Sequence, residues 1–270
     1  MKIIDAHTHV FPDPLAPRAI QALADPGRHN PHYDATLPGL LDKMAEAGVS
    51  HSITLPVATR PGQVETINEF AVRQPRELIT PFGGIHPDLE DPAAVLREFP
   101  ELGLAGFKFH PDYQECAPDD PRMAPILETA QELGLIAYFH AGWDVGPTTC
   151  YGTPEAFART LDAYPDLTVA LAHFGGYRCW DEVEELLVGR DVYLDTSYTF
   201  DDIDREQFVR MVDAHGHERV MFGSDGPWTD PVENIAYLHD CGFTEERLEW
   251  IFHKTAESML ARSSVRSVPA

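Results

Sequence analysis

Cysteine, basic residues and long apolar runs are all scarce in this sequence, and each shortage excludes a class of protein. Four cysteines in 270 residues, without a CxxC pair, do not make a disulfide framework and favour a reducing cytoplasm. No apolar run approaches the roughly 20 residues that cross a bilayer, and Met1–Asp5 enters a predicted strand without the apolar region of a signal peptide. The sequence therefore favours a cytoplasmic protein without a membrane partner.

The charge is strongly one-sided. Only 20 Lys and Arg residues face 44 Asp and Glu residues, which gives a formal net charge of −24 at pH 7. A field of this sign repels nucleic-acid backbones and anionic bilayers, so we expect a small-molecule substrate and no nucleic-acid partner. An anionic substrate would need a local positive charge, which makes any lysine in a candidate site informative.

Short apolar runs alternate with amphipathic stretches along the whole chain. The apolar runs are continuous rather than alternating in polarity, as are strands buried on both faces of a parallel sheet. Eight strands are predicted: Lys2–His7, His51–Val57, Leu78–Gly84, Leu104–His110, Leu135–His140, Leu167–His173, Asp191–Thr196 and Arg219–Ser224. The helices predicted between and after them are Leu37–Ala47, Gln63–Gln74, Pro92–Glu101, Pro121–Leu133, Pro154–Tyr164, Asp181–Val188, Arg205–His215 and Val232–His239.

Eight strands, each followed by a helix, predict an α/β fold, the (β/α)8 TIM barrel with a parallel eight-stranded barrel. A doubly wound open sheet is the alternative. We expect one domain over residues 1–262, with Thr244–Ala261 as an extra C-terminal helix, and a disordered polar tail over 263–270. Val10–Asp34, rich in Pro and His, is predicted to be a long irregular loop, a kind that is usually functional.

Two histidines end the first predicted strand. His7 and His9 are separated by one residue, so their side chains point in the same direction, toward the barrel mouth. An HxH pair is a weak signal alone. Its position at the C-terminal end of a barrel strand, where the active sites of such barrels form, favours a metal site.

Three more ionisable residues end or follow other predicted strands. His140 closes the fifth, His173 closes the sixth and Asp225 follows the eighth. Each alone is explained by a hydrogen-bonded histidine or a helix-capping carboxylate. Together they indicate a shared partner such as a metal ion, because ionisable groups at the ends of apolar strands are otherwise costly to bury. Asp5, deeper in the first strand, is interpreted as barrel packing in preference to support of His7.

This set of residues, on predicted strands one, five, six and eight, resembles the amidohydrolase superfamily. The segments KIIDAHTHVFP (residues 2–12) and FGSDGPW (residues 222–228) are similar to the amidohydrolase 2 branch, which contains aminocarboxymuconate-semialdehyde decarboxylase. The resemblance implies that His7, His9, His140 and Asp225 bind one divalent ion, usually zinc. It also implies that His173 stands beside the activated water as an acid/base or electrostatic helper, and enzymes of this branch often self-associate, so a homo-oligomer is compatible with it.

The residue types suit the same chemistry. Three imidazoles and one carboxylate favour Zn, with Mn, Fe, Co and Ni as alternatives. Such an ion lowers the pKa of a water molecule from about 15.7 to about 7. Asp225 can bind the ion and accept the proton of that water, and His173 can donate a proton or stabilise a developing oxyanion.

Lys108 departs from the pattern of the mononuclear branch. It lies in the fourth predicted strand and shares a face with His110. In binuclear members of the superfamily a lysine here is carboxylated and bridges two metals, which leaves the metal count open. We rank a free ammonium that binds an anionic substrate first, a carboxylated bridge to a second metal second, and a lysine paired with a buried carboxylate third.

Loops after the strands supply candidate substrate contacts, with loop packing as the alternative for each. The predicted contacts are Trp143, Arg178 and Trp228 beside Lys108, and further candidates are Asp144, Tyr177, Tyr198 and, as a minor contact, His86. Arg28 and Arg60 are the candidate counterparts of the arginine with which the decarboxylases bind the substrate carboxylate, but neither lies in a matching motif. Cys116, Cys150 and Cys179 are interpreted as incidental.

Two enzyme functions remain. The first is a metal-dependent hydrolase in which activated water attacks a small, anionic carbonyl-type substrate; the second is a non-oxidative decarboxylase of an unsaturated or aromatic acid. The missing arginine motif favours the hydrolase. A barrel that only binds a ligand is a third hypothesis, and the complete set of five polar residues argues against it.

Overall fold

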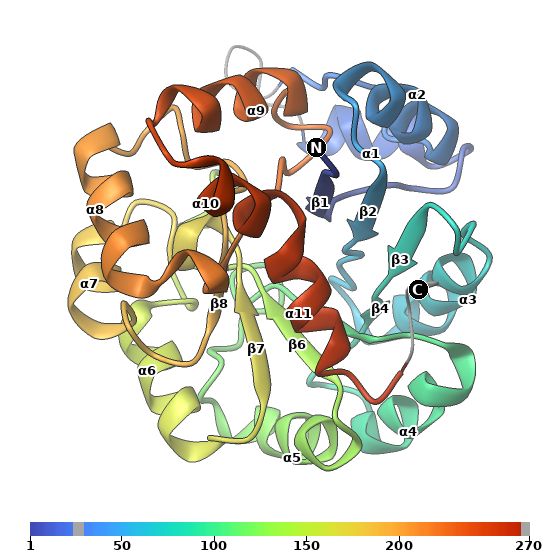
Figure 1. Cartoon of the computed structure of the whole chain (residues 1–270). Coiled ribbons are helices and arrows are strands. Elements are labelled where there is room, and N and C mark those ends of the chain that lie inside the picture. Colours follow the sequence, from blue (N-terminus) through green and yellow to red (C-terminus); the bar gives the residue numbers. More distant parts are fainter. Residues whose placement is uncertain (24–29, 266–270) are drawn as a thin grey trace.

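The barrel predicted from the sequence is confirmed in the computed structural model, which describes residues 1–23 and 30–265 (Figure 1). Its strands are β1 (Ile4–Thr8), β2 (His51–Thr54), β3 (Ile79–Pro81), β4 (Gly83–Gly84), β5 (Gly106–Phe109), β6 (Ile136–Phe139), β7 (Thr168–Leu171), β8 (Tyr193–Asp195) and β9 (Val220–Met221). Every pair of neighbouring strands is parallel. β3 and β4 are two parts of the third barrel strand, interrupted at Phe82, whose backbone N–H donates to the carbonyl of Thr54 at 3.0 Å.

The first and last strands meet and close the sheet. The backbone N–H of Ala6 donates to the carbonyl of Phe222 at 2.8 Å, and Thr8 forms a parallel bridge with Gly226. An open doubly wound sheet would leave these two edges apart, so the closure excludes that alternative. The barrel interior is filled by a buried apolar cluster made of Ile4, Ala6, Ile53, Leu55, Phe82, Ala105, Ile136, Tyr138, Ala170, Ala172, Tyr193, Met221, Ala256, Met259 and Leu260.

Helices surround the barrel as predicted: α2 (Leu37–Ala47), α3 (Val64–Val72), α4 (Pro92–Leu102), α5 (Ala124–Leu133), α6 (Pro154–Ala163), α7 (Trp180–Leu186), α8 (Arg205–His215) and α9 (Pro231–Asp240). The start signals have a local physical cause. Thr36, Asp91, Thr153 and Asp230 each cap a helix with a side-chain oxygen, and each is followed by proline in the first turn. Larger buried apolar residues pack between these helices and the strands.

Two expectations about irregular segments are wrong, one in the segment after β1 and one after the last helix. The segment Val10–Asp34 contains a helix, α1 (Ala16–Leu23), while residues 24–29 lie outside the described residues. The extra C-terminal helix predicted over Thr244–Ala261 is confirmed: α10 (Glu245–Glu249) continues through a π-helical turn (Trp250–Lys254) into α11 (Thr255–Ala261). α11 lies across one end of the barrel in Figure 1.

The segment 263–265, which we expected to be part of a disordered tail, is held against the barrel. Ser263 Oγ donates to the carbonyl of Ala105 at 3.0 Å, and the backbone N–H of Ser264 donates to the carbonyl of Gly134 at 3.0 Å. Val265 is buried. Hydrogen bonds to carbonyls of the barrel end therefore order these three residues, and residues 266–270 lie outside the described part of the chain.

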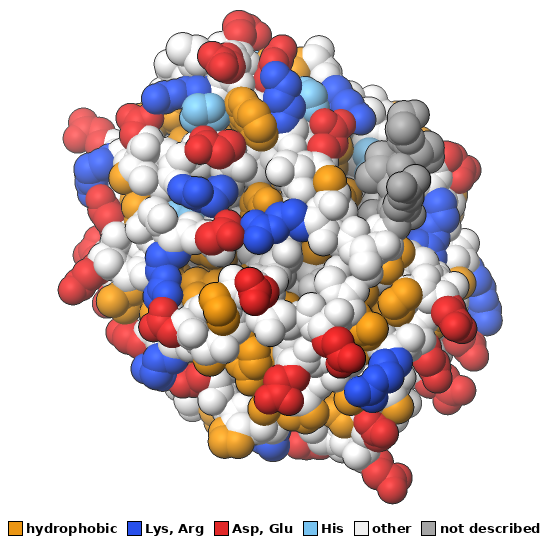
Figure 2. Space-filling view, turned by 60° about the horizontal axis from the view of Figure 1, so that its bottom comes forward, with side chains coloured by type: hydrophobic (Ala, Val, Ile, Leu, Met, Phe, Trp, Pro, Cys, Tyr) orange, Lys and Arg blue, Asp and Glu red, His pale blue; other side chains and the backbone are white. Residues whose placement is uncertain are grey.

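Acidic and basic side chains are interspersed on the face shown in Figure 2. Ion pairs such as Arg122 with Asp88, at 3.1 Å, and Arg210 with Glu184, at 2.7 Å, join exposed side chains. Across the described ranges, no helix is both long and apolar enough to cross a membrane.

Candidate metal centre and active site

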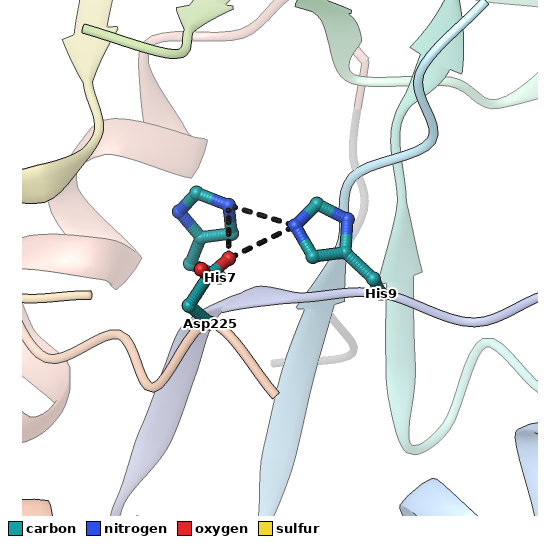
Figure 3. A group of neighbouring side chains, drawn as sticks. All are labelled: His7, His9 and Asp225. Atoms are coloured by element: carbon teal, nitrogen blue, oxygen red, sulfur yellow. Dashed lines mark hydrogen bonds and ion pairs between the residues drawn. The ribbon is translucent and has the colours of Figure 1, made fainter. Parts of the chain in front are cut away.

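Three of the predicted metal ligands converge at the barrel mouth (Figure 3). His7 Nε2 lies 3.2 Å from His9 Nε2, and Asp225 Oδ1 lies 3.2 Å from the first nitrogen and 3.0 Å from the second. His7 lies in β1 and His9 directly follows it, whereas Asp225 follows β9, so closure of the barrel brings these groups together. The arrangement gives three ligand atoms from the two ends of the sheet within one small volume.

The other ring nitrogens of both histidines are occupied by acceptors. His7 Nδ1 lies 2.8 Å from Asp195 Oδ2, and His9 Nδ1 lies 2.7 Å from the carbonyl of Leu55. Because a carbonyl and a carboxylate only accept hydrogen bonds, each Nδ1 carries the proton and each Nε2 of a neutral ring presents a lone pair. Burial, and then the charge of Lys108, lower the pKa of His7 to about 3 and keep it neutral.

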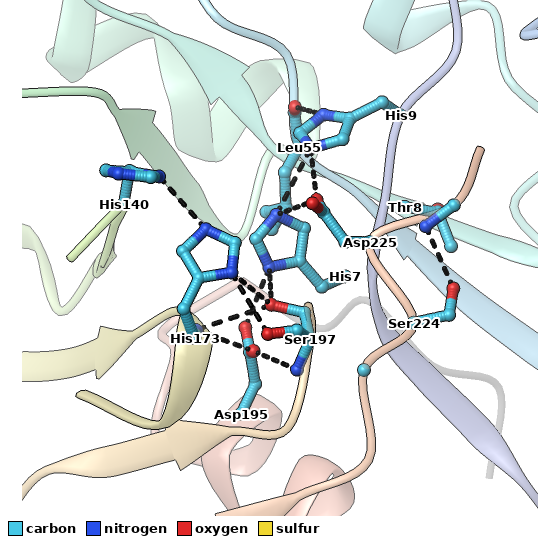
Figure 4. A network of polar contacts seen from close by, with 12 residues as sticks. His7, Thr8, His9, Leu55, His140, His173, Asp195, Ser197, Ser224 and Asp225 are labelled. Atoms are coloured by element: carbon cyan, nitrogen blue, oxygen red, sulfur yellow. Dashed lines mark hydrogen bonds and ion pairs between the residues drawn. The ribbon is translucent and has the colours of Figure 1, made fainter. Parts of the chain in front are cut away.

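Asp195 is a central residue of the site that the sequence analysis missed (Figure 4). It ends β8 and is fully buried, and besides His7 it accepts hydrogen bonds from Tyr138 Oη at 2.5 Å and the backbone N–H of Ser197 at 2.8 Å. Burial raises its pKa, but His7 and the hydrogen bonds to it lower the pKa well below the ordinary value, so it is a carboxylate. The signal that identified His140 was an ionisable residue at the end of an apolar strand, and the predicted strand Asp191–Thr196 instead placed Asp195 one residue before its end.

His140 lies in a second group, together with His110 and Asp144. Its ring stacks on that of His110, with centroids 3.9 Å apart, and His110 Nε2 lies 3.0 Å from Asp144 Oδ2. His140 Nδ1 lies 2.9 Å from His173 Nε2. The predicted four-ligand set is therefore divided in this structure between the cluster of three and this second group.

The hydrogen bonds of His173 fix which nitrogen of His140 is free. His173 Nδ1 donates to the carbonyl of Ser197 at 3.0 Å, so its Nε2 accepts from His140 Nδ1. His140 Nε2 is then left with a lone pair, and it is a buried polar atom without a hydrogen-bond partner among the described residues. Buried nitrogens are normally hydrogen-bonded, so this free lone pair makes His140 Nε2 available as a metal ligand.

The backbone at two of these residues is in the left-handed region. His173 has a φ of 56° and Asp225 a φ of 63°, which is uncommon for residues other than glycine. The turn at Asp225 is held by its N–H, which donates to the carbonyl of His7 at 2.8 Å, and by Asp5, whose Oδ1 accepts from the N–H of Ser224 at 2.9 Å. Asp5 thus joins β1 to the segment that carries Asp225, and its carboxylate is bonded to Ser224 rather than to the ligand atoms.

Lys108 is buried beside the first cluster. Its Nζ lies 3.3 Å from His7 Nε2 and 5.2 Å from the centre of the Tyr138 ring. Burial lowers the pKa of Lys108 to about 8, against the opposing effect of nearby carboxylates. The third-ranked interpretation, a lysine paired directly with a carboxylate, does not fit, because no carboxylate oxygen of the described residues forms an ion pair with it within 4.0 Å.

These residues line a cavity of about 170 Å³. The predicted contacts Trp143 and Trp228, together with Asp144, Tyr177 and Tyr198, lie in its wall, as do Val10, Phe11 and Leu23 from the segment after β1. The prediction of a functional segment there is compatible with this position. The cavity wall is mainly apolar and aromatic, and among the described residues Lys108 is the only lysine or arginine in it.

Other candidates lie elsewhere. Arg178 does not line the cavity, because its guanidinium lies over the Tyr177 ring at 4.8 Å and 3.8 Å from Asp202. Arg60 is exposed and His86 is buried outside the cavity wall, where its Nδ1 accepts from the backbone of Asp88. Arg28 lies outside the described residues. Arg178 therefore lies outside the described cavity wall, and its role as a substrate contact stays a prediction.

A parallel barrel with histidines and carboxylates gathered at the C-terminal mouth is the architecture of a large class of barrel enzymes. The family model described as amidohydrolase matches residues 4–262. The chain therefore belongs to the amidohydrolase family and is an enzyme of that family, as its sequence motifs predicted. No curated protein matches the sequence.

Solved structures support the fold. The chain is 20% identical to an uncharacterised TIM-barrel protein from Bordetella bronchiseptica, with a TM-score of 0.74 over 97% of this chain and 99% of that one. It is 16% identical to the 5-carboxyvanillate decarboxylase from Sphingomonas paucimobilis (TM-score 0.71, 96% and 99% covered). It is 22% identical to a putative 2-pyrone-4,6-dicarboxylic acid hydrolase from Pseudomonas putida (TM-score 0.69, 97% and 98% covered).

Proposed function

We propose that the protein is a metal-dependent hydrolase of a small anionic carbonyl compound, with one divalent ion held by His7, His9, Asp225 and His140. The observation that carries the proposal is the meeting of three acceptor atoms. His7 Nε2, His9 Nε2 and Asp225 Oδ1 lie 3.0–3.2 Å apart, and the tautomers of neutral rings place no proton between them. Lone pairs this close repel one another unless a cation lies between them.

The donor set fits a first-row divalent ion, with zinc preferred, because it combines three neutral imidazoles with one carboxylate. Burial opposes ionisation of Asp225, but the adjacent histidines lower its pKa to about 2, so it is charged at neutral pH. Such an ion would supply the means to lower the pKa of a water molecule and to polarise a carbonyl group. Manganese is named for a dihydroxybenzoic acid decarboxylase of the same fold, from a Polaromonas species, which supports manganese as an alternative to zinc.

The residues around the centre have separate tasks. Asp225 accepts the proton that the attacking water loses, and the water oxygen forms a bond to the carbonyl carbon. As the bond to the leaving oxygen or nitrogen breaks, that atom takes up the proton that Asp225 accepted, and His173 stands beside the reacting groups as an electrostatic helper. Lys108 Nζ donates a hydrogen bond to His7 Nε2. A divalent ion bound to His7 Nε2 would replace this hydrogen bond and leave the ammonium free to bind a substrate carboxylate.

A decarboxylase is the second candidate, favoured by the aromatic cavity wall around Trp143, Tyr177 and Trp228. In that reaction the bond between a ring carbon and the carboxylate breaks, CO₂ leaves and a proton takes its place on the carbon. The 5-carboxyvanillate decarboxylase of similar fold acts on such an acid, as its name states. The absence of arginine from the described cavity wall leaves only Lys108 to bind a carboxylate and keeps the hydrolase first.

Two measurements test the proposal. Metal analysis of the purified protein is expected to give one divalent ion per chain, with most of it lost in His9→Ala and Asp225→Asn and retained in His239→Ala, an exposed histidine of α9. A panel of aromatic acids and lactone carboxylates is then assayed in H₂¹⁸O. Label in the organic product supports the hydrolase. Release of CO₂ together with an organic product that carries no label supports the decarboxylase. A metal-free wild type that stays inactive after reconstitution would refute both.

A further inference from the structure

Two cysteines that the sequence analysis set aside as incidental are brought together outside the metal centre. Cys150 lies in the loop between β6 and α6, and Cys179 immediately precedes α7. Their side chains form a hydrogen bond with each other, and each residue is half-buried. Both line a second hollow together with Trp143, Thr149 and Glu155, so small molecules have access to the pair.

The surrounding backbone holds the two loops in this arrangement. Gly142 pairs with Gly152 on one side, where its N–H donates at 2.8 Å, and forms a parallel bridge with Tyr177 on the other. The N–H of Trp143 donates to the carbonyl of Tyr177 at 3.0 Å, and the N–H of Tyr177 donates to that of Ala141 at 2.9 Å. Each cysteine lies two residues from one of these paired positions, so their contact is built into the loops.

The hydrogen bond makes the two thiols unequal. The S–H of Cys150 donates to the sulfur of Cys179, which lowers the pKa of Cys179, while the same bond and burial raise the pKa of Cys150. The thiolate is the reactive form of cysteine, so Cys179 is the nucleophile and Cys150 is placed to react second.

We propose that Cys150 and Cys179 are a redox modification site that forms a reversible disulfide when it meets a small disulfide oxidant such as oxidised glutathione. The thiolate of Cys179 attacks one sulfur of the oxidant, breaks its S–S bond and releases one thiol as a mixed disulfide forms. Cys150 then loses its proton and attacks the sulfur of Cys179, which releases the second thiol. The protein loses two electrons and two protons, and the oxidant gains both.

The crosslink would join two loops that each contribute to the active-site cavity. The loop of Cys150 carries Trp143 and Asp144, and the loop of Cys179 carries Tyr177. Oxidation therefore fixes one side of the cavity wall. The site is independent of the metal and of the proposed reaction, so it is tested without any assay of activity.

The test incubates the full-length protein with oxidised glutathione and counts free thiols after denaturation, followed by mass spectrometry of proteolytic peptides. We expect the count to fall from four to two, with a single linked pair of peptides that contain Cys150 and Cys179, and to return to four with dithiothreitol. Cys116 is fully buried and is expected to stay reduced.

Single variants separate a built pair from unspecific oxidation. Cys150→Ser is expected to accumulate a glutathione adduct on Cys179, and Cys179→Ser to keep Cys150 as a free thiol. Cys241→Ser, which changes a cysteine at the end of α9, should crosslink like the wild type. Four free thiols in excess oxidant, adducts without a link between the two peptides, or a link that involves Cys116 or Cys241 would overturn the proposal.

Discussion

Asp195 orients His7, a proposed metal ligand, although it is not itself one of the proposed ligands. It accepts from His7 Nδ1, from the hydroxyl of Tyr138 and from the backbone N–H groups of His173 and Ser197. One buried carboxylate therefore fixes the tautomer of a proposed ligand and the turn that carries His173. Carboxylates that bind the second nitrogen of a ligand histidine commonly raise its affinity for metal.

Asp195→Asn is expected to weaken metal binding by about 10- to 100-fold, because an NH₂ group replaces one acceptor oxygen beside His7. Competition with a chelator of known affinity measures the change. Tyr138→Phe is the matched control, since it removes another hydrogen bond of Asp195 and leaves the contact with His7 in place. Equal metal affinity in Asp195→Asn and wild type would show that this carboxylate has no part in binding.

Lys108 is the only lysine or arginine in the described cavity wall, so it is the candidate for binding a substrate carboxylate. Lys108→Met is expected to raise KM for an anionic substrate from the panel by about 10- to 100-fold, because a buried charged hydrogen bond contributes about 1.5–3 kcal/mol. Steady-state kinetics with the neutral methyl ester of the same substrate is the control. A similar rise in KM for acid and ester would assign Lys108 to the metal centre instead.

The two loops that follow β6 and β7 depend on a close backbone approach at Gly142. Its φ is 80°, and an added Cβ would lie 2.2 Å from the backbone nitrogen of Tyr177. Both the conformation and the space therefore require glycine.

Gly142→Ala is expected to lower the free energy of unfolding by at least about 2 kcal/mol, since left-handed backbone alone costs an alanine about 1–2 kcal/mol and a steric clash is added. Urea unfolding measures the difference. Gly146→Ala in the same loop should stay within about 0.5 kcal/mol of the wild type, because nothing lies within 4 Å of its added Cβ. If both variants are equally stable, the two loops are not held together at Gly142.

The elements were predicted with greater success than their ends and their loop contacts. Eight apolar runs identified eight barrel strands, because burial on both faces leaves a continuous pattern. The helix α1 was missed because prolines at positions 12, 14 and 17 make its start read as a loop. The contact between Cys150 and Cys179 had no local signal, since it depends on how two loops pair with Gly142. Asp195 was missed for a different reason: the predicted strand extended to Thr196, whereas β8 ends at Asp195.

At the scale of the whole molecule, stability depends on a buried histidine far from the cavity wall. His215 at the end of α8 donates from Nε2 to the carbonyl of Val192 at 2.9 Å and accepts from the N–H of Gly189 at 3.1 Å. It thereby fixes α8 to the segment that immediately precedes β8. Burial lowers its pKa from 6.5 to about 4, so the folded protein holds it neutral.

The stability that neutral His215 contributes is complete above pH 6.5 and is lost as the pH falls toward 4, because the unfolded chain takes up the proton first. Between pH 7.5 and pH 5 this loss is about 2 kcal/mol. Urea unfolding of wild type and His215→Gln is expected to show a gap that narrows by about this amount at pH 5. A gap that is constant with pH would mean that His215 titrates alike in both states.

The closure of the barrel between β1 and β9 has a consequence for the order of events during synthesis. His7 and His9 are synthesised before β2 to β9, whereas Asp225 and the segment that pairs with the second edge of β1 follow all the other barrel strands. A nascent chain that ends before β9 holds the two proposed ligand histidines at the end of a strand that has only one neighbour, β2. The proposed set of ligands is therefore complete only after β9 and Asp225 have been made, so an ion bound earlier would lack the carboxylate.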